Sequence, residues 1–135
     1  MLTVAEVNEQ FANTFTTTVG ITLTEVGPGW AAGRVAVRPD LINVNSSLHG
    51  GAIATLADAT CSAGAMVNRP EGATSHATLE MKLNLLSPLR VGAARCEARL
   101  RHGGRTTQVW DAEVNDEESG AVLALFRCTM IMLSS

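Results

Sequence analysis

The stretch GGAIATLADATCSAGAM, residues 50–66, decides how the chain folds. Its residues are small or apolar on every side, and it contains no Lys, Arg or Glu. A helix that is apolar all round is buried inside a protein, whereas a surface helix carries a polar face. The stretch therefore predicts a helix at the centre of the molecule, with the rest of the chain packed around it.

The segments on either side of this helix are mostly strand-like. Residues 3–16 predict a short amphipathic helix, because Thr3 can act as its N-cap and Glu6 stands at the capping-box position. Alternating apolar residues separated by turn residues predict strands elsewhere. These strands are expected over residues 21–26, 30–37, 74–87, 92–102, 105–115 and 121–133.

The order of these elements is helix, two strands, buried helix and four strands. Such segregation of strands and helices is typical of the α+β class, with an antiparallel sheet that has helices on one face. A sheet that covers a helix with no polar side must curl around it. The chain has no internal repeat, low-complexity tract or linker, so we expect residues 1–135 to form one domain.

The composition favours a protein that hides part of its surface in an oligomer. Hydrophobic residues make up 46% of the chain and charged residues only 17%, which is low for a small monomer. The net charge of −3 gives no overall attraction to nucleic acid. Five of the ten basic residues lie between Arg90 and Arg105, and the simplest interpretation of this cluster is a solvated strand surface.

Other features of the sequence indicate a cytoplasmic protein that has no contact with a membrane. The N-terminal segment has no basic region of a signal peptide, and no run of 18 apolar residues could cross a bilayer. Cys61, Cys96 and Cys128 lack the spacing of a metal site, so we expect buried free thiols in a reducing compartment and no bound metal.

Asp58 is the one charged residue of the buried helix. An ionised carboxylate inside a protein costs several kcal/mol unless it is paired or hydrated. Its neighbours one helical turn away are Ala54, Thr55, Cys61 and Ser62, which offer weak hydrogen bonds at best. Asp58 either meets solvent or a strand arginine, or it has a chemical role.

His49, Gly50 and Gly51 stand where the preceding loop becomes the helix. The free N–H groups of a helix N-terminus stabilise negative charge, so the Gly50 amide could donate to an oxyanion, although glycine could equally serve a tight turn. Asp58 lies about 12 Å further along the helix and about 80° around it. If the two groups act on one carbonyl, they come from different subunits.

The pattern N-x-x-S-x-x-H-G-G-x6-D, from Asn43 to Asp58, resembles the acyl-CoA thioesterases of the phenylacetate-degradation type, which have the hotdog fold. The resemblance covers roughly residues 15–133 and includes TLEMKLNLLSPLRVG and RHGGRTTQVWDAEV. Related proteins often have glycine three residues before the histidine, where this chain has Ser46. The fold implied is a long central helix wrapped by a curved antiparallel sheet.

The resemblance implies hydrolysis of an acyl-CoA thioester without a metal or redox cofactor, since coenzyme A is part of the substrate. The Gly50 amide would polarise the thioester carbonyl, and Asn43 and His49 would orient the substrate or the water. Asp58 of the partner subunit would be the general base or the nucleophile, with the Thr78 hydroxyl near it. The implied assembly is a homotetramer of dimers that share their active sites.

The resemblance also implies a binding surface for the substrate. Charge-assisted contacts of arginine with the phosphates of coenzyme A favour Arg90, Arg101 and Arg105, and the second His-Gly-Gly is expected in a hairpin turn that either binds coenzyme A or faces solvent. The substrate-binding residues implied are Gly51, Leu85, Arg90, His102, Gly103, Gly104, Arg105 and Thr106.

Two other functions remain open at this stage. A hotdog hydratase or dehydratase would use His49 and Asp58 to move a proton on the acyl chain. An acyl-CoA sensor would bind the ligand without turnover, but this acidic chain has no basic helix-turn-helix segment. The acyl group cannot be named from the sequence.

A few further side chains are assigned to structural positions. Trp30 and Trp110 are expected in the core or an interface. His76 is expected at the surface, in the loop before its strand, and Glu80 and Lys82 as an exposed pair.

Overall fold

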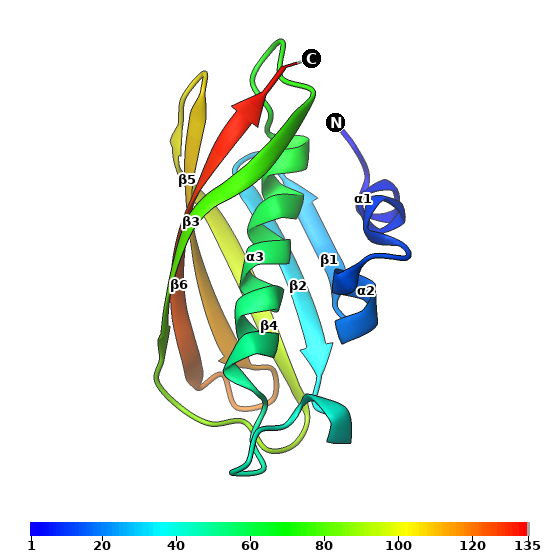
Figure 1. The fold of residues 1–135 in the computed structure, drawn as a ribbon, viewed down its shortest axis with the longest axis vertical. Coiled ribbons are helices and arrows are strands. Elements are labelled where there is room, and N and C mark those ends of the chain that lie inside the picture. Colours follow the sequence, from blue (N-terminus) through cyan, green and yellow to red (C-terminus); the bar gives the residue numbers. More distant parts are fainter. Residues whose placement is uncertain (135) are drawn as a thin grey trace.

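The computed structural model describes residues 1–134 and consists of one long helix, two short N-terminal helices and six strands (Figure 1). The helices are α1 (Val4–Phe11), α2 (Phe15–Val19) and α3 (Gly50–Val67), with one 3-10 turn, η1 (Pro39–Leu41). The strands are β1 (Thr22–Gly27), β2 (Trp30–Ala36), β3 (Ser75–Leu85), β4 (Ala93–Gly103), β5 (Thr107–Asp116) and β6 (Val122–Leu133). Each expected strand is present, with its ends within two residues of the predicted ones.

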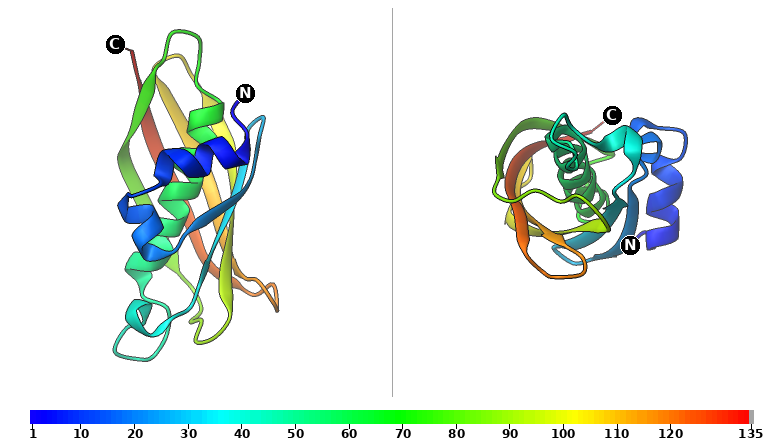
Figure 2. Two further views of the ribbon diagram at one scale, coloured as in Figure 1. Left: turned by 90° about the vertical axis from the view of Figure 1, so that its right-hand side faces the viewer. Right: turned by 90° about the horizontal axis from the view of Figure 1, so that it is seen from below.

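The six strands form a single sheet in the order β1-β2-β4-β5-β6-β3, and every neighbouring pair is antiparallel. The end-on view in Figure 2 shows the sheet curling around α3, with α1 and α2 outside it on the side of β1. β3 and β1 are the two edge strands. This arrangement confirms the α+β class and the curved sheet around a central helix.

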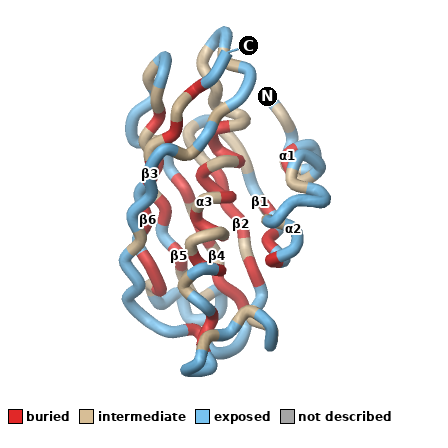
Figure 3. Tube along the Cα trace, in the orientation of Figure 1, coloured by how far each residue is buried: buried red, intermediate tan, exposed pale blue. Residues whose placement is uncertain are grey.

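The small residues of α3 allow the sheet to approach it closely. Ten of its eighteen residues are buried, and the face that carries Thr55, Asp58 and Ser62 is only half-buried (Figure 3). Trp110 of β5 is fully buried, as expected, and its ring fills the space beside Gly64, where a Cβ would be closer than van der Waals contact. The Trp110 Nε1–H donates to Gln108 Oε1 at 2.8 Å, so its polar edge is also satisfied.

The N-terminal segment differs from the prediction of one helix over residues 3–16. The expected capping box is present, since the Thr3 hydroxyl accepts from the Glu6 N–H at 3.2 Å and the Thr3 N–H donates to Glu6. The helix ends at Phe11 because Asn13 adopts a left-handed conformation with φ of 60°, which asparagine tolerates better than most residues. A second helix then begins at Phe15, whose side chain is 69% exposed.

The second His-Gly-Gly is also placed differently from the prediction. His102 and Gly103 are the last residues of β4, and the turn consists of residues 104–106. A bulge between Leu100 and His102 adds a residue to this strand. Consequently the strand that follows begins at Thr107.

Cys61, Cys96 and Cys128 are buried free thiols, as expected. Among residues 1–134, no helix combines the length and the apolar character needed to cross a membrane.

Candidate active site

The Asp58 carboxylate lies on the side of α3 that faces β3. Thr78 of β3 donates a hydrogen bond of 2.8 Å from its hydroxyl to Asp58 Oδ1. No Lys, Arg or His within residues 1–134 forms an ion pair with this carboxylate, so the expected alternative of a strand arginine is not met within the described chain. Burial raises the pKa of Asp58 above its ordinary value, and the Thr78 hydrogen bond opposes part of that rise.

A cavity of about 240 Å³ adjoins the Asp58 carboxylate. Phe11 of α1 and Phe15 of α2 form its aromatic wall, and Met81 of β3 adds a flexible apolar side chain. Thr55, Asp58 and Ser62 follow one another at one-turn spacing along α3 and supply the polar groups. The cavity is therefore apolar on one side and polar along the helix, which suits a largely apolar ligand that carries a polar group.

The N-terminus of α3 is organised by His49. Its side-chain Nδ1 accepts a hydrogen bond of 2.8 Å from the Gly51 N–H, which identifies His49 as the N-cap residue. In residues 1–134 no hydrogen bond from the Gly50 N–H is found, so this donor is available to a ligand. A Cβ on residue 50 would lie 2.7 Å from the Leu85 Cδ1 atom. Glycine at this position therefore lets Leu85 lie directly beside the free amide.

Asn43 fixes the loop that leads into this helix. Its Oδ1 accepts from the N–H groups of Asn45 at 2.9 Å and Ser47 at 3.1 Å, and from the Ser47 hydroxyl at 3.2 Å. Ser46 lies between them with φ of 62°, in the left-handed region that glycine adopts most readily. The left-handed backbone at Ser46 therefore explains why related proteins often have glycine at this position.

The Gly50 amide and the Asp58 carboxylate are not brought together within one chain. A second cavity of about 410 Å³ lies at the N-terminus of α3 and is lined by His49 and Gly51. It meets the Asp58 cavity at Phe15 and Thr55, which line both. The eight-residue spacing along the helix, about 12 Å, still separates the two groups.

The residues predicted to contact the substrate lie at two opposite ends of the molecule. Arg90 is exposed in the loop after β3, and this loop is tied to the α3 entrance by a 2.7 Å hydrogen bond from the Leu48 N–H to the Leu89 carbonyl. His102 and the turn 104–106 lie at the other end, beyond the C-terminal end of α3 (Figure 1). One chain alone therefore does not assemble these residues around one ligand.

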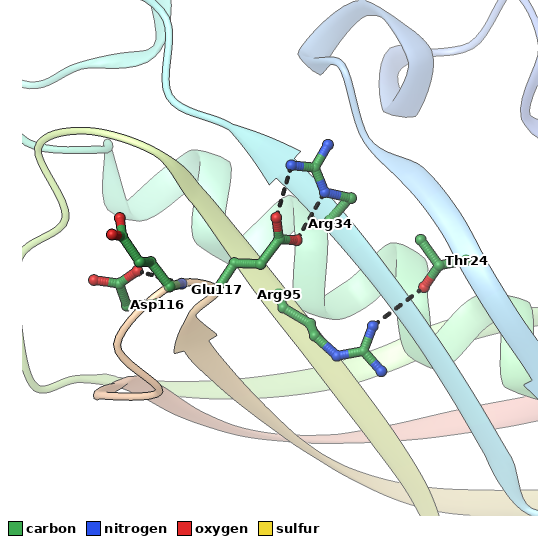
Figure 4. Close-up of polar contacts among 6 residues, drawn as sticks. Thr24, Arg34, Arg95, Asp116 and Glu117 are labelled. Carbon is green, nitrogen blue, oxygen red and sulfur yellow. Dashed lines mark hydrogen bonds and ion pairs between the residues drawn. The ribbon is translucent and has the colours of Figure 1, made fainter.

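The remaining arginines of the basic cluster are paired on the outer face of the sheet. Arg95 approaches Thr24 at 3.5 Å and Glu97 at 3.3 Å, while Glu117 holds Arg34 nearby with two hydrogen bonds (Figure 4). Two further arginines are paired. The Arg99 guanidinium lies 4.4 Å from the centroid of the half-buried Trp30 ring, and Arg101 forms an ion pair with Asp111 at 3.4 Å. These contacts agree with a solvated strand surface, and Arg101 is directed away from the central helix.

The prediction for His76 was wrong. His76 belongs to β3, is half-buried, and its Nε2 lies 2.7 Å from the Ser62 hydroxyl of α3. The sequence contains the signal, because His76 precedes Thr78 by two residues and alternate residues of a strand share a face. Glu80 and Lys82 are exposed, as expected. Within residues 1–134, no three His, Cys, Asp or Glu side chains are grouped so that they could hold a metal ion.

Comparisons with known proteins agree with this fold. A family model described as Thioesterase superfamily matches residues 45–123. A 1,4-dihydroxy-2-naphthoyl-CoA hydrolase from Listeria monocytogenes is 31% identical over 84% of this chain and 90% of its own length.

Solved structures of related proteins superpose closely. A thioesterase from Haemophilus influenzae has a TM-score of 0.91 and 25% identity, covering 99% of this chain and 92% of its own. A point mutant of the phenylacetic acid degradation protein PaaI from Thermus thermophilus has a TM-score of 0.79 and 26% identity, covering 88% and 98%. With the match over residues 45–123 and the curved sheet around α3, the chain belongs to the thioesterase superfamily and has its hotdog fold.

Proposed function

We propose that the protein hydrolyses an acyl-CoA thioester, with Asp58 as the group that activates water. The single observation that carries this proposal is the unpaired, half-buried Asp58 carboxylate, which is held by Thr78 at the wall of an acyl-sized cavity. Burial keeps the pKa of Asp58 above its ordinary value, and a raised pKa makes a carboxylate a stronger base. The Listeria relative is a hydrolase of an aryl-CoA thioester, which supports the same substrate class.

In the proposed reaction Asp58 removes a proton from water as the water oxygen attacks the thioester carbonyl carbon. The carbonyl oxygen becomes an oxyanion, which the Gly50 N–H stabilises by a hydrogen bond. The tetrahedral intermediate then collapses, the C–S bond breaks, and coenzyme A leaves with the proton that Asp58 had taken. Direct attack by the Asp58 carboxylate, through an anhydride that water hydrolyses, uses the same groups.

We infer that the two reacting groups come from two copies of the chain, related by a two-fold axis. β3 is an edge strand of eleven residues, and it exposes Leu79, Met81 and Leu85 by 60%, 49% and 55%. A long apolar edge is normally covered by another strand, and antiparallel pairing with the β3 of a second copy would cover it. Such pairing runs the two α3 helices in opposite directions, so the N-terminus of one approaches the middle of the other.

The same two-fold relation supports the proposed coenzyme A contacts. It turns the partner end over end, so that the partner's turn 104–106 meets the end that carries Gly50 and Arg90. Arg90 and Arg105 would then reach the phosphates from two chains. Gly51, Leu85, His102, Gly103, Gly104 and Thr106 would complete the surface, while Asn43 and His49 would hold the loop and the helix N-terminus in place.

The experiment that tests the function is the release of free thiol from a panel of aryl- and alkyl-CoA esters. We expect wild-type protein to release thiol and Asp58→Asn to lose activity by several orders of magnitude at an unchanged oligomeric state. Asp116→Asn, at the last residue of β5, is the matched control and should retain activity. Release by Asp58→Asn at the wild-type rate would remove Asp58 from the mechanism, and silence of the folded wild type would refute the proposed reaction.

A further inference from the structure

A row of three polar side chains continues the active-site face of α3 beyond Asp58. Ser62 lies one helical turn after Asp58, and its hydroxyl is 2.7 Å from His76 Nε2. The other ring nitrogen of His76, Nδ1, faces Nη2 of Arg69 at 3.4 Å. Arg69 follows the end of α3, and its Nε has no hydrogen-bond partner among the described residues. The row is therefore Arg69, His76, Ser62, with Ser62 nearest to Asp58.

The arginine determines which nitrogen of His76 carries the proton. A guanidinium group only donates hydrogen bonds, so Nδ1 of His76 has to be the acceptor. Burial and the positive charge of Arg69 lower the pKa of His76 to about 4, so the ring is neutral at neutral pH. A neutral ring with an unprotonated Nδ1 carries its proton on Nε2. His76 therefore donates to the Ser62 oxygen.

This direction excludes a nucleophilic role for Ser62. A histidine activates serine by accepting the hydroxyl proton, but Nε2 of His76 is already protonated. The Ser62 oxygen instead accepts from His76, and the Ser62 O–H is left to donate elsewhere. Within residues 1–134 it donates to no other group, unlike the Thr55 hydroxyl, which donates to the Gly51 carbonyl at 2.8 Å.

The free Ser62 O–H lies in the wall of the same cavity as the Asp58 carboxylate. Their spacing of four residues corresponds to about 6 Å along the helix. The wall opposite the helix consists of the apolar Phe11, Phe15 and Met81 together with Thr16. A ligand in this cavity therefore meets an acceptor at Asp58 and, about 6 Å further on, the Ser62 hydroxyl as a donor that His76 holds in place.

On the basis of the proposed function, we propose that Ser62 recognises an oxygen atom in the acyl group of the substrate, and that His76 and Arg69 position Ser62 for this contact. The substrate class is then an acyl-CoA with a keto or hydroxyl oxygen several bonds from the thioester carbon. A plain hydrocarbon acyl group would leave the Ser62 hydroxyl without an acceptor, which a buried polar group tolerates poorly. Ser62 contacts the substrate, whereas His76 is a positioning residue that acts through Ser62.

The test compares matched pairs of substrates that differ in this oxygen. One pair is hexanoyl-CoA and the oxohexanoyl-CoA with its keto group on the penultimate carbon, and the other is para-methylbenzoyl-CoA and para-hydroxybenzoyl-CoA. We expect wild-type protein to favour the oxygenated member of at least one pair by about tenfold or more in kcat/KM. Ser62→Ala and His76→Leu should bring that ratio close to one, mainly by lowering kcat/KM for the oxygenated ester.

Two further variants separate positioning from a general effect on structure. His76→Gln can still donate to Ser62 through its amide and should restore part of the ratio, and Ser119→Ala, a matched serine in the exposed turn before β6, should not change it. Equal kcat/KM within both pairs for wild-type protein, or a wild-type ratio in Ser62→Ala, would overturn the proposal and leave the hydrolase function standing. Absence of thiol release from all four esters would refute both proposals.

Discussion

Thr78 of β3 donates a 2.8 Å hydrogen bond to Asp58 of α3, across the gap between an edge strand and the central helix. Thr78 is also the last residue before a register shift in the pairing of β3 with β6. After this shift, odd-numbered instead of even-numbered residues of β3 point toward α3. Beyond the shift, Met81 lines the Asp58 cavity and Leu85 lies beside Gly50. The register shift in β3 thus places the Thr78 hydroxyl beside Asp58, the Met81 side chain in the cavity wall and the Leu85 side chain over the N-terminus of α3.

Replacing Thr78 by valine should raise the pKa of Asp58 further. The Thr78 hydrogen bond lowers this pKa and burial raises it, so removing the hydroxyl leaves burial unopposed. If Asp58 is the base, the acid limb of the profile of kcat/KM against pH moves to higher pH in Thr78→Val. Thr78→Ser keeps the hydroxyl, so its acid limb should lie at the same pH as that of the wild type. An acid limb at the same pH in the wild type, Thr78→Val and Thr78→Ser would argue against Asp58 as the titrating base.

Asp58→Asn should be more stable than the wild type at neutral pH. The folded-state pKa of Asp58 is raised above 3.8, the ordinary pKa of an aspartate side chain, so the ionised carboxylate opposes folding above that folded pKa. Below about pH 3.8 the carboxyl group is protonated in both states and the difference vanishes. Urea unfolding at several pH values measures this. A stability gain that does not depend on pH would have a different cause.

The role of the Gly50 N–H can be tested by removing only that hydrogen. Residue 50 is the first of α3, where proline is well tolerated, and His49 has φ of −60° and ψ of 136°, which suits a residue before proline. The proline ring needs the space of Leu85, so Leu85→Ala is both the background and the control. Gly50→Pro in this background should lower kcat by about 10²–10³. Unchanged kcat in the folded double variant would exclude the Gly50 amide as the oxyanion donor.

Sharing of the active site between two chains predicts complementation. Asp58→Asn and the Gly50→Pro, Leu85→Ala variant are each expected to be nearly inactive alone. Refolded together in equal amounts, half of the dimers are mixed and each has one intact pair of groups, with Gly50 from the chain that keeps Leu85, so activity should return to about a quarter of the wild-type level. Size-exclusion chromatography of the mixture checks that dimers form. Without recovery in mixed dimers, both groups would have to act within one chain.

Gly64→Ala should destabilise the fold because its Cβ would overlap the buried Trp110 ring. Overpacking of a tight core costs about 1–3 kcal/mol, against which the better helix propensity of alanine offsets about 1 kcal/mol. Gly27→Ala, where a Cβ would meet nothing within 4 Å, is the matched control. The free energy of unfolding in urea measures both, and equal values would mean that Trp110 moves aside.

The central helix and the strands were predictable from the sequence because each follows from a local pattern. The apolar circumference of residues 50–66 and the alternation within each strand depend on few distant contacts. The N-terminal helix was predicted too long because Val4, Val7, Phe11 and Phe15 keep a helical spacing across a break that a single residue, Asn13, introduces by its backbone conformation.

The site was predictable where a residue type carries its own chemistry. A lone acid on an apolar helix and glycines at a helix N-terminus are recognisable as such, and the contact of Thr78 with Asp58 follows the resemblance. The contact of His76 with Ser62 depends on which turn of α3 faces which residue of β3. That register is set by the packing of distant segments, and the strand bounds were not known closely enough to infer it.

The wall of the Asp58 cavity has a consequence for how such a protein can change over time. Phe11, Phe15 and Thr16 form the N-terminal part of that wall, and all three precede residues 45–123, the part that the family model matches. Asp58, Gly50 and Thr78 all lie within those residues. The N-terminal part of the wall and the groups proposed to react thus lie in separate stretches of the chain. Substitutions among the first twenty residues can alter which acyl groups fit, while the groups proposed to cleave the thioester stay the same.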